Sequence, residues 1–229
     1  MGNGMKKTIR TAVFLLATAC SCAAGELPGK DGSFRFGDAV FNLRCAWNGW
    51  KASARNRDWK ESAERREGDT TIFSGFLPGL SGVSVAETVV PEKDGRTALR
   101  FELNAPSPVS FTAVYGELVL PASTRKIWID GAALALPEEP AEQYPARNRR
   151  AKQVQIPLSD SRVLTVEGDL RITVQDNRLL KRNTFDLRFL AAPDTGNIQS
   201  ASLALSFSVK PVEAREVDLS AAANLGFAD

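Results

Sequence analysis

The stretch that decides the fold is residues 162–175, RVLTVEGDLRITVQ. Apolar side chains occupy alternate positions on both sides of Gly168 and Asp169, which is the period of a β-strand with one buried face. A Gly-Asp pair between two alternating runs is typical of a two-residue hairpin turn. The stretch therefore predicts two antiparallel strands that are joined at Gly168 and Asp169.

The same pattern extends along most of the chain. Two further hairpins are predicted, one around Asp130-Gly131 and one with a longer loop at residues 91–95. Single strands are predicted at Phe111–Leu120, Phe185–Leu190 and Ser202–Val209. Consecutive hairpins at this spacing predict an all-β fold, an antiparallel β-sandwich or super-sandwich.

Two segments depart from the alternating pattern. Asp58–Arg66 is charged, and it fits either a short helix or one arm of an exposed hairpin. Glu138–Lys152 contains two prolines, which predicts a surface loop. Its basic run, Arg147–Lys152, fits a solvated loop or a contact for an acidic glycan or a partner protein.

The N-terminus has the order of a bacterial export signal. Lys6, Lys7 and Arg10 precede a short apolar run, and small residues follow it. The small residues predict a cleavage site after Ala24. The apolar run is shorter than the ~20 residues that a membrane-spanning helix needs. An alternative is a lipoprotein box that ends at Cys20, which would anchor the protein to a membrane by a lipid. The protein is therefore expected to be periplasmic or extracellular, either released or anchored.

The predicted domains are a signal segment at 1–24, a β-sandwich at 25–220 and a tail or linker start at 221–229. Removing the three basic residues of the signal from the 29 Lys and Arg residues leaves 26, against 27 Asp and Glu residues. Binders of nucleic acid carry a strongly basic face, so this balance argues against nucleic acid. After cleavage the remaining cysteine is Cys45, for which we expect a buried apolar position.

The absence of histidine restricts the chemistry. It excludes Ser-His-Asp and Cys-His catalysis and the usual zinc sites, and no pattern indicates a cofactor or metal. Paired carboxylates that hydrolyse glycosidic bonds remain as an alternative. Alternation predicts that most acidic residues in or beside strands face solvent, which disfavours an enzyme. The acidic candidates are Glu87, Glu102, Glu117, Glu167, Asp169, Asp176 and Asp186.

Three tryptophans fall within thirteen residues. Trp47, Trp50 and Trp59 are interspersed with polar residues, among them Asn48 and Arg57. An exposed aromatic ring with polar neighbours suits the apolar face and the hydroxyl groups of a sugar. These five residues are the candidate glycan-binding site, and packing of the tryptophans in the core is the alternative.

The chain resembles the N-terminal non-catalytic β-sandwich or super-sandwich region of large exported bacterial glycoside hydrolases. The resemblance covers about residues 80–229 and rests on Val163–Arg178, Phe185–Phe189 and Arg215–Asp229. It implies an accessory region whose closing segment leads into another domain, and it carries over no catalytic residue.

These observations together predict a non-catalytic exported accessory module of carbohydrate processing. Its expected partner is a glycan or the catalytic domain of a glycoside hydrolase. Two alternatives stay open: a structural or interaction lipoprotein of the cell envelope anchored at Cys20, and a carboxylate-dependent glycan hydrolase or lyase.

Overall fold

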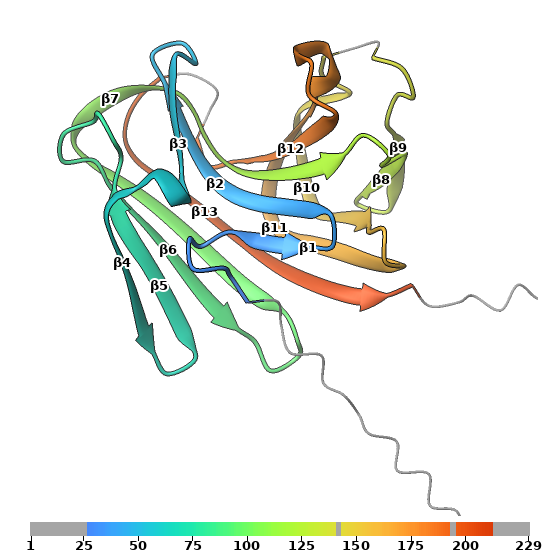
Figure 1. The fold of residues 1–229 in the computed structure, drawn as a ribbon, viewed down its shortest axis with the longest axis horizontal. Coiled ribbons are helices and arrows are strands. Elements are labelled where there is room, and N and C mark those ends of the chain that lie inside the picture. The colour runs from blue at the N-terminus through green and yellow to red at the C-terminus, as the bar shows by residue number, and fades with distance from the viewer. Residues whose placement is uncertain (1–26, 141–142, 193–195, 213–229) are drawn as a thin grey trace, which may run out of the picture.

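The computed structural model describes residues 27–140, 143–192 and 196–212 (Figure 1). The predicted all-β antiparallel fold is confirmed, because every strand pairing in it is antiparallel. The predicted export segment, with Cys20, and the tail at 221–229 lie outside the described residues. The strands are β1 (Phe34–Phe36), β2 (Ala39–Trp47), β3 (Ala52–Arg55), β4 (Lys60–Glu67), β5 (Thr70–Phe76), β6 (Ser84–Pro91), β7 (Thr97–Pro121), β8 (Lys126–Ile129), β9 (Ala132–Ala135), β10 (Ala146–Pro157), β11 (Arg162–Asp176), β12 (Thr184–Leu190) and β13 (Gly196–Pro211), with 3-10 turns η1 (Asn56–Asp58) and η2 (Asn177–Leu180).

The long strand β7 belongs to two layers. Its first part, Thr97–Asn104, lies between β6 and β13, and its last part, from Phe111 onward, lies beside β2 and then between β2 and β12. Between these parts the register with β13 shifts at a segment that contains Pro106 and Pro108. Proline has no N–H to donate to a neighbouring strand, so this segment is where the strand can leave the ladder and bend.

Two strands, β12 and β13, each pair with both β7 and β11, and we name each layer after the one that it contains. The β13 layer contains β4, β5, β6, the first part of β7, β13 and the first part of β11. The β12 layer contains β3, β2, the last part of β7, β12 and the last part of β11. Figure 1 shows β2 in front of β13, with β4, β5 and β6 on one side of the picture and β8 and β9 on the other.

The core between the layers is centred on an aromatic cluster. The ring of Phe207 from β13 lies 5.3, 5.2 and 5.0 Å from the rings of Phe34, Phe36 and Phe41, which come from β1 and β2. All four side chains are buried, and aromatic pairs at this spacing add about 1 kcal/mol each beyond the burial of their area. On β7, Gly116 leaves room for Phe41, since a Cβ atom there would lie 2.6 Å from that ring.

Two of the predicted hairpins are confirmed. Strands β8 and β9 pair around Asp130 and Gly131, which both have positive φ, at 51° and 77°. Strands β6 and β7 pair from Ser84 opposite Asn104 to Pro91 opposite Thr97. The charged segment Asp58–Arg66 is largely β4, one arm of an exposed hairpin with β5, so the helical alternative is wrong.

The predicted hairpin at Gly168 and Asp169 is wrong, because β11 runs through both residues without turning. Glu167 pairs with Gln153 and Leu170 with Ala151, so β11 has one residue more than β10 here, which defines a β-bulge. A bulge favours the same residues as a tight turn, and the sequence pattern alone does not separate the two. At this bulge β11 ends its pairing with β13 and goes on to pair with β12.

The predicted surface loop at Glu138–Lys152 is wrong in its second half. Residues from Ala146 onward form β10, which pairs with β11. Arg147, Arg149 and Arg150 are exposed on this strand. Their charges suggested a loop, but a strand of this type is stabilised by main-chain pairing and by its buried positions, such as Ala151.

We predict that Gly168→Ala lowers the free energy of unfolding by about 3 kcal/mol, because φ is +156° and the new Cβ would lie 2.8 Å from the carbonyl oxygen of Ala204. The control is Gly68→Ala, where φ is +59° and no atom lies within 4 Å. The control should lose only about 1 kcal/mol. Urea denaturation measures both, and an equal loss in the two variants would contradict the role of the bulge.

Candidate functional site

Polar side chains are buried on the outer face of the β12 layer. Alternation along β7, β11 and β12 turns Leu118, Val174 and Leu187 into the core and their neighbours outward. An outward sheet face is ordinarily solvated, but most of these outward side chains are buried. We call this set the polar face; its members are Arg44, Tyr115, Glu117, Thr173, Gln175, Asp186 and Arg188.

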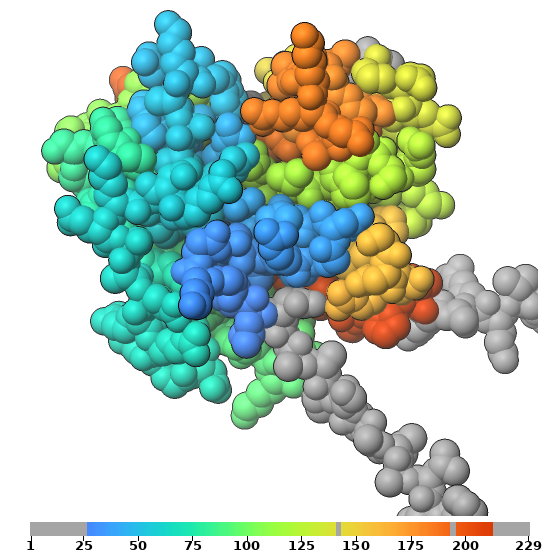
Figure 2. Space-filling view, in the orientation of Figure 1, coloured from blue at the N-terminus to red at the C-terminus, as the bar shows by residue number. Residues whose placement is uncertain are grey.

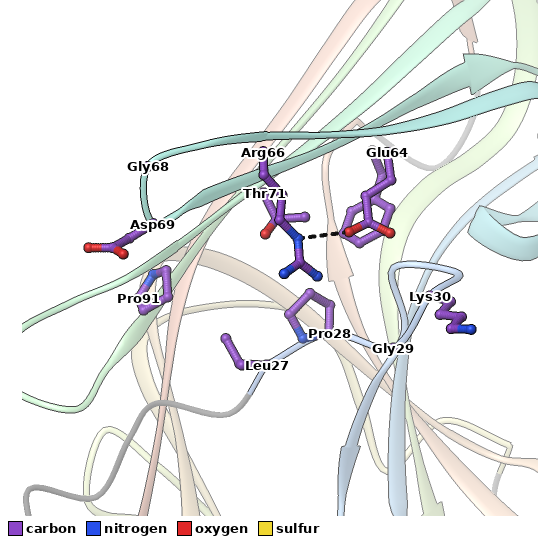
Figure 3. Close-up of a pocket in the computed structure, with 11 residues that line it drawn as sticks. Leu27, Pro28, Gly29, Lys30, Glu64, Arg66, Gly68, Asp69, Thr71 and Pro91 are labelled. Carbon is purple, nitrogen blue, oxygen red and sulfur yellow. Dashed lines mark hydrogen bonds and ion pairs between the residues drawn. The ribbon is translucent and has the colours of Figure 1, made fainter.

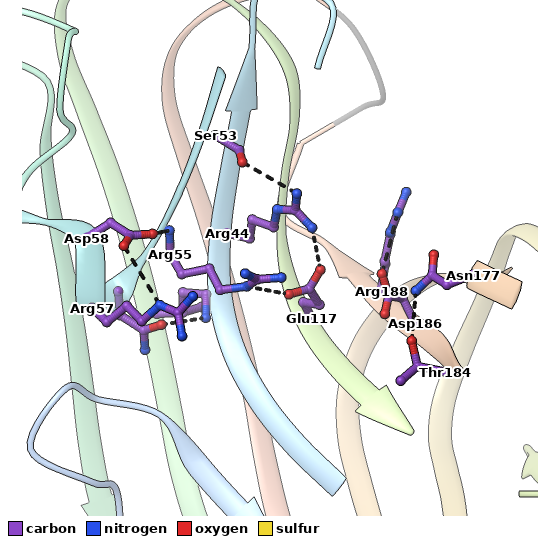
Figure 4. Close-up of polar contacts among 12 residues, drawn as sticks. Arg44, Ser53, Arg55, Arg57, Asp58, Glu117, Asn177, Thr184, Asp186 and Arg188 are labelled. Atoms are coloured by element: carbon purple, nitrogen blue, oxygen red, sulfur yellow. Dashed lines mark hydrogen bonds and ion pairs between the residues drawn. The ribbon is translucent and has the colours of Figure 1, made fainter. Parts of the chain in front are cut away.

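The centre of the polar face is an ion-pair triad (Figure 4). Glu117 is fully buried, and its two carboxylate oxygens accept hydrogen bonds from Arg44 Nη1 at 2.6 Å and from Arg55 Nε at 2.8 Å. Burial alone would raise the pKa of Glu117, but the charge of Arg44 and the hydrogen bond from Arg55 outweigh it and the pKa lies below its usual value. Glu117 is therefore a charged group that ties β7 to β2 and β3.

The pKa of a second carboxylate, that of Asp186, shifts in the opposite direction. Burial and the negative charge of Glu117 raise the pKa of Asp186, against a hydrogen bond from Asn177 and the charge of Arg188. The nearest carboxylate oxygen lies 3.7 Å from Arg188 Nη2. The polar face thus holds one acid that stays ionised and a neighbour that binds its proton more tightly than usual.

The guanidinium group of Arg188 lies against two aromatic rings, which also contact each other at 6.3 Å. Its central carbon lies 5.1 Å from the ring centre of Trp50 and 5.0 Å from that of Tyr115. Trp50 belongs to the tight turn between β2 and β3 and has φ of +70°, a conformation that costs an aromatic residue roughly 1–3 kcal/mol. The hydroxyl of Thr112 accepts a hydrogen bond from the N–H of Gly49 in this turn at 3.0 Å.

The polar face opens into a hollow beside Trp50. One part, of about 420 Å³, is lined by Trp50, Tyr144, Asp186 and Arg188, among others. A second part, of about 180 Å³, shares Trp50, Tyr144 and Arg188 with the first and adds Arg147. We call both parts together the Trp50 hollow. Figure 2 shows a notch at this place, between the projecting β2–β3 turn in blue and the orange segment around η2.

Three polar atoms of this region are buried without a hydrogen-bond partner. They are Arg44 Nε, Arg188 Nε and Tyr115 Oη. Burial raises the pKa of Tyr115 to about 12, so its hydroxyl keeps its proton at neutral pH. All three atoms are enclosed by the side chains around them, so this region has a polar interior.

The predicted glycan-binding residues are not brought together. Trp50 is 47% exposed and lines the hollow, whereas Trp59 is buried against Phe101 at 6.5 Å and Trp47 is half-buried against the core. Asn48 is exposed in the β2–β3 turn but does not line the hollow.

Arg57 is also exposed and lies elsewhere, 3.8 Å from Asp58, beside a hollow that Trp59 and Lys30 also line. Cys45 is buried in the core, as expected, and burial raises the pKa of its thiol.

The expectation that most strand carboxylates face solvent is wrong. Glu87, Glu117, Asp176 and Asp186 are buried. Glu87 lies on the core face of β6, where its Oε2 accepts a hydrogen bond from Asn56 at 3.3 Å and burial raises its pKa well above the usual value. The exposed or half-exposed acids are Glu102, Glu167 and Asp169.

Sequence reasoning did not select Arg188, Tyr115 or Arg44. A signal for Arg188 was present, because the alternation in Phe185–Phe189 puts Asp186 and Arg188 on one face of a central strand. No local signal identifies Tyr115 as their neighbour, since it comes from β7, more than sixty residues earlier.

Another hollow, of about 380 Å³, lies between residues 27–30 and the β4–β5 hairpin (Figure 3). Arg66 there pairs with Glu64 at 3.0 Å, and the Arg66 side chain is largely exposed. Among the described residues that line it, none has a buried polar atom without a partner. The Trp50 hollow is therefore the stronger candidate site.

A scan against protein-family models gives no match for this chain, and a search of curated proteins gives none either. Within the described ranges, no group of three or more acidic or cysteine residues is placed to hold a metal ion. No helix in the same ranges has the length and apolar character needed to cross a membrane.

We predict that Glu117→Gln lowers the free energy of unfolding by about 3 kcal/mol, because it leaves two partly buried arginines without their counter-charge. The matched control is Glu102→Gln, whose pair with Arg100 is largely exposed and contributes at most about 1 kcal/mol.

The same variant should change the response to acid. Because the pKa of Glu117 is lowered in the folded state, its contribution is present above the unfolded pKa of about 4.3 and is lost as the pH falls below that value. Urea denaturation at pH 7 and pH 3 should show a smaller acid-dependent loss in Glu117→Gln than in the unchanged chain. Equal effects in the variant and in Glu102→Gln would show that the triad has no such role.

Proposed function

We propose that this chain is an exported, non-catalytic accessory module that binds a glycan in the Trp50 hollow. The observation that carries the proposal is the exposed ring of Trp50 beside the guanidinium group of Arg188, since both residues line the same hollow. A sugar ring offers an apolar C–H face to an aromatic side chain and hydroxyl oxygens to a hydrogen-bond donor. Both complementary groups lie on the wall of one hollow.

The backbone at Trp50 supports a binding role. A positive φ is uncommon for an aromatic residue, and strain of this kind is concentrated at functional sites. The turn conformation places the ring over Arg188 and leaves 47% of the residue exposed.

The acidic groups support a binding role over hydrolysis. Hydrolysis of a glycosidic bond ordinarily needs two carboxyl groups that reach the substrate, about 5–10 Å apart. Asp186 is the one acid among the described residues that line the Trp50 hollow. Its neighbour Glu117 is fully buried behind Arg44 and Arg55, which occupy both of its oxygens. Glu117 therefore suits an organising role and not the attack on a sugar.

Export is part of the proposal and rests on the order of basic, apolar and small residues up to Ala24, with anchoring through Cys20 as the alternative form. Contact with a glycoside hydrolase catalytic domain is the alternative to direct glycan binding. The exposed side chain of Leu180, which lines the hollow, and that of its exposed neighbour Leu179 favour such a protein contact.

We predict that Trp50→Gly weakens glycan binding about ten-fold or more, equivalent to at least about 1.4 kcal/mol. Glycine accepts the positive φ of this position, so relief of strain should offset lost packing and the variant should stay folded. Isothermal titration calorimetry against a panel of soluble neutral and acidic polysaccharides measures binding, and thermal unfolding checks the fold.

The control is Trp128→Ala. Trp128 is a half-buried tryptophan on β8 that does not line the hollow. Its replacement should leave binding unchanged. A chain that binds no member of the panel, or one that tolerates Trp50→Gly, would overturn the proposal.

A further inference from the structure

The charges that line the Trp50 hollow are strongly unbalanced. Four arginines face it, namely Arg44, Arg147, Arg182 and Arg188, against one acid, Asp186, among the described residues. The chain after signal removal is close to neutral, so this local excess does not follow from its composition. A concave site with one sign of charge concentrates ligands of the opposite sign.

The positive charges of these four guanidinium groups are offset by nearby acids to different extents. Arg44 is bonded to Glu117, and Arg188 lies near Asp186 and donates a hydrogen bond from Nη2 to Gln175. Arg147 stacks on the ring of Tyr144 at 5.2 Å. Neither Arg147 nor Arg182 forms an ion pair with an acid in the described part of the chain. Two charged groups at the rim are therefore available to a ligand.

An exposed arginine without a partner is ordinary on a protein surface, so the rim alone would not define a site. The deeper observation is Arg188, which lines both parts of the hollow although it is only 8% exposed. A guanidinium group presents a planar set of donors that matches carboxylate and sulfate oxygens. Arg188 places such a group at the wall of the hollow.

Asp186 opposes an anion less than an ordinary aspartate would. Burial and the neighbouring Glu117 raise its pKa, which favours the protonated carboxyl. Its carboxylate also lies 3.7 Å from Arg188 Nη2, which offsets its negative charge within the hollow.

From these contacts we infer that the ligand of the Trp50 hollow is an anionic glycan, whose sugar units carry carboxylate or sulfate groups. This inference rests on the proposed function and narrows it to a ligand class. The rings of Trp50 and Tyr144 would contact the faces of sugar units, and Arg147, Arg182 and Arg188 would bind the acidic groups.

The test compares glycans that differ only in charge. Oligogalacturonate is compared with its methyl-esterified form, and a sulfated galactan oligosaccharide with its desulfated form, by isothermal titration calorimetry at low salt. The unchanged chain should bind at least one charged form about ten-fold more tightly than its neutral partner, which is the size expected for one charge-assisted hydrogen bond. The two pairs show whether carboxylate or sulfate is the acidic group.

Variants then assign the effect to the hollow. Arg147→Gln and Arg182→Gln should each weaken binding of the charged form by roughly three- to ten-fold, the size of one exposed charge contact, and so lower the ratio of the affinities for the charged and neutral forms. Arg35→Gln is the control, because Arg35 is exposed on β1 and does not line the hollow. An equal loss in Arg35→Gln would indicate unspecific attraction and overturn the inference.

The outcomes separate this inference from the proposed function. Equal affinity for charged and neutral forms, with loss of both in Trp50→Gly, would overturn the anionic ligand and leave glycan binding intact. Failure to bind any of the four glycans or the wider panel would overturn both.

Discussion

The constraint on which the rest of the structure depends is that long strands serve both layers: β11 does so, and so does β7. Its first part is flanked by β6 and β13 and its last part by β2 and β12. The change of neighbours occurs around Pro106 and Pro108, where the pairing with β13 is irregular. Because the strand is continuous, the layers cannot separate, and the aromatic rings of Phe41 and Phe207 meet between them.

The polar face is a consequence of this arrangement. The last part of β7 is central in the β12 layer, so its outward residues, Tyr115 and Glu117, have strands on both sides and the β2–β3 turn above them. Burial of a carboxylate without compensation would be costly, and the two arginines on β2 and β3 supply that compensation. The same burial holds Arg188 at the wall of the Trp50 hollow. Structure and proposed binding therefore share one set of residues.

The sequence predicted the fold class because alternation and Asp-Gly turns are local signals, as in β8 and β9. It failed at Gly168, where a bulge and a turn favour the same residues, and at β10, whose exposed arginines resemble a loop. The tryptophan cluster led to Trp50, but local sequence could not show that Trp59 turns into the core. The contact of Trp50 with Arg188 depends on pairings across more than 130 residues, which no short pattern encodes.

The most direct test of the central claim, that the Trp50 hollow binds a glycan, is a crystal structure of the chain soaked with an acidic oligosaccharide. The account predicts a sugar ring against Trp50, with an acidic oxygen within hydrogen-bond distance of Arg188. An empty hollow at saturating oligosaccharide, or a sugar bound only at another surface such as that beside Arg57, would contradict it.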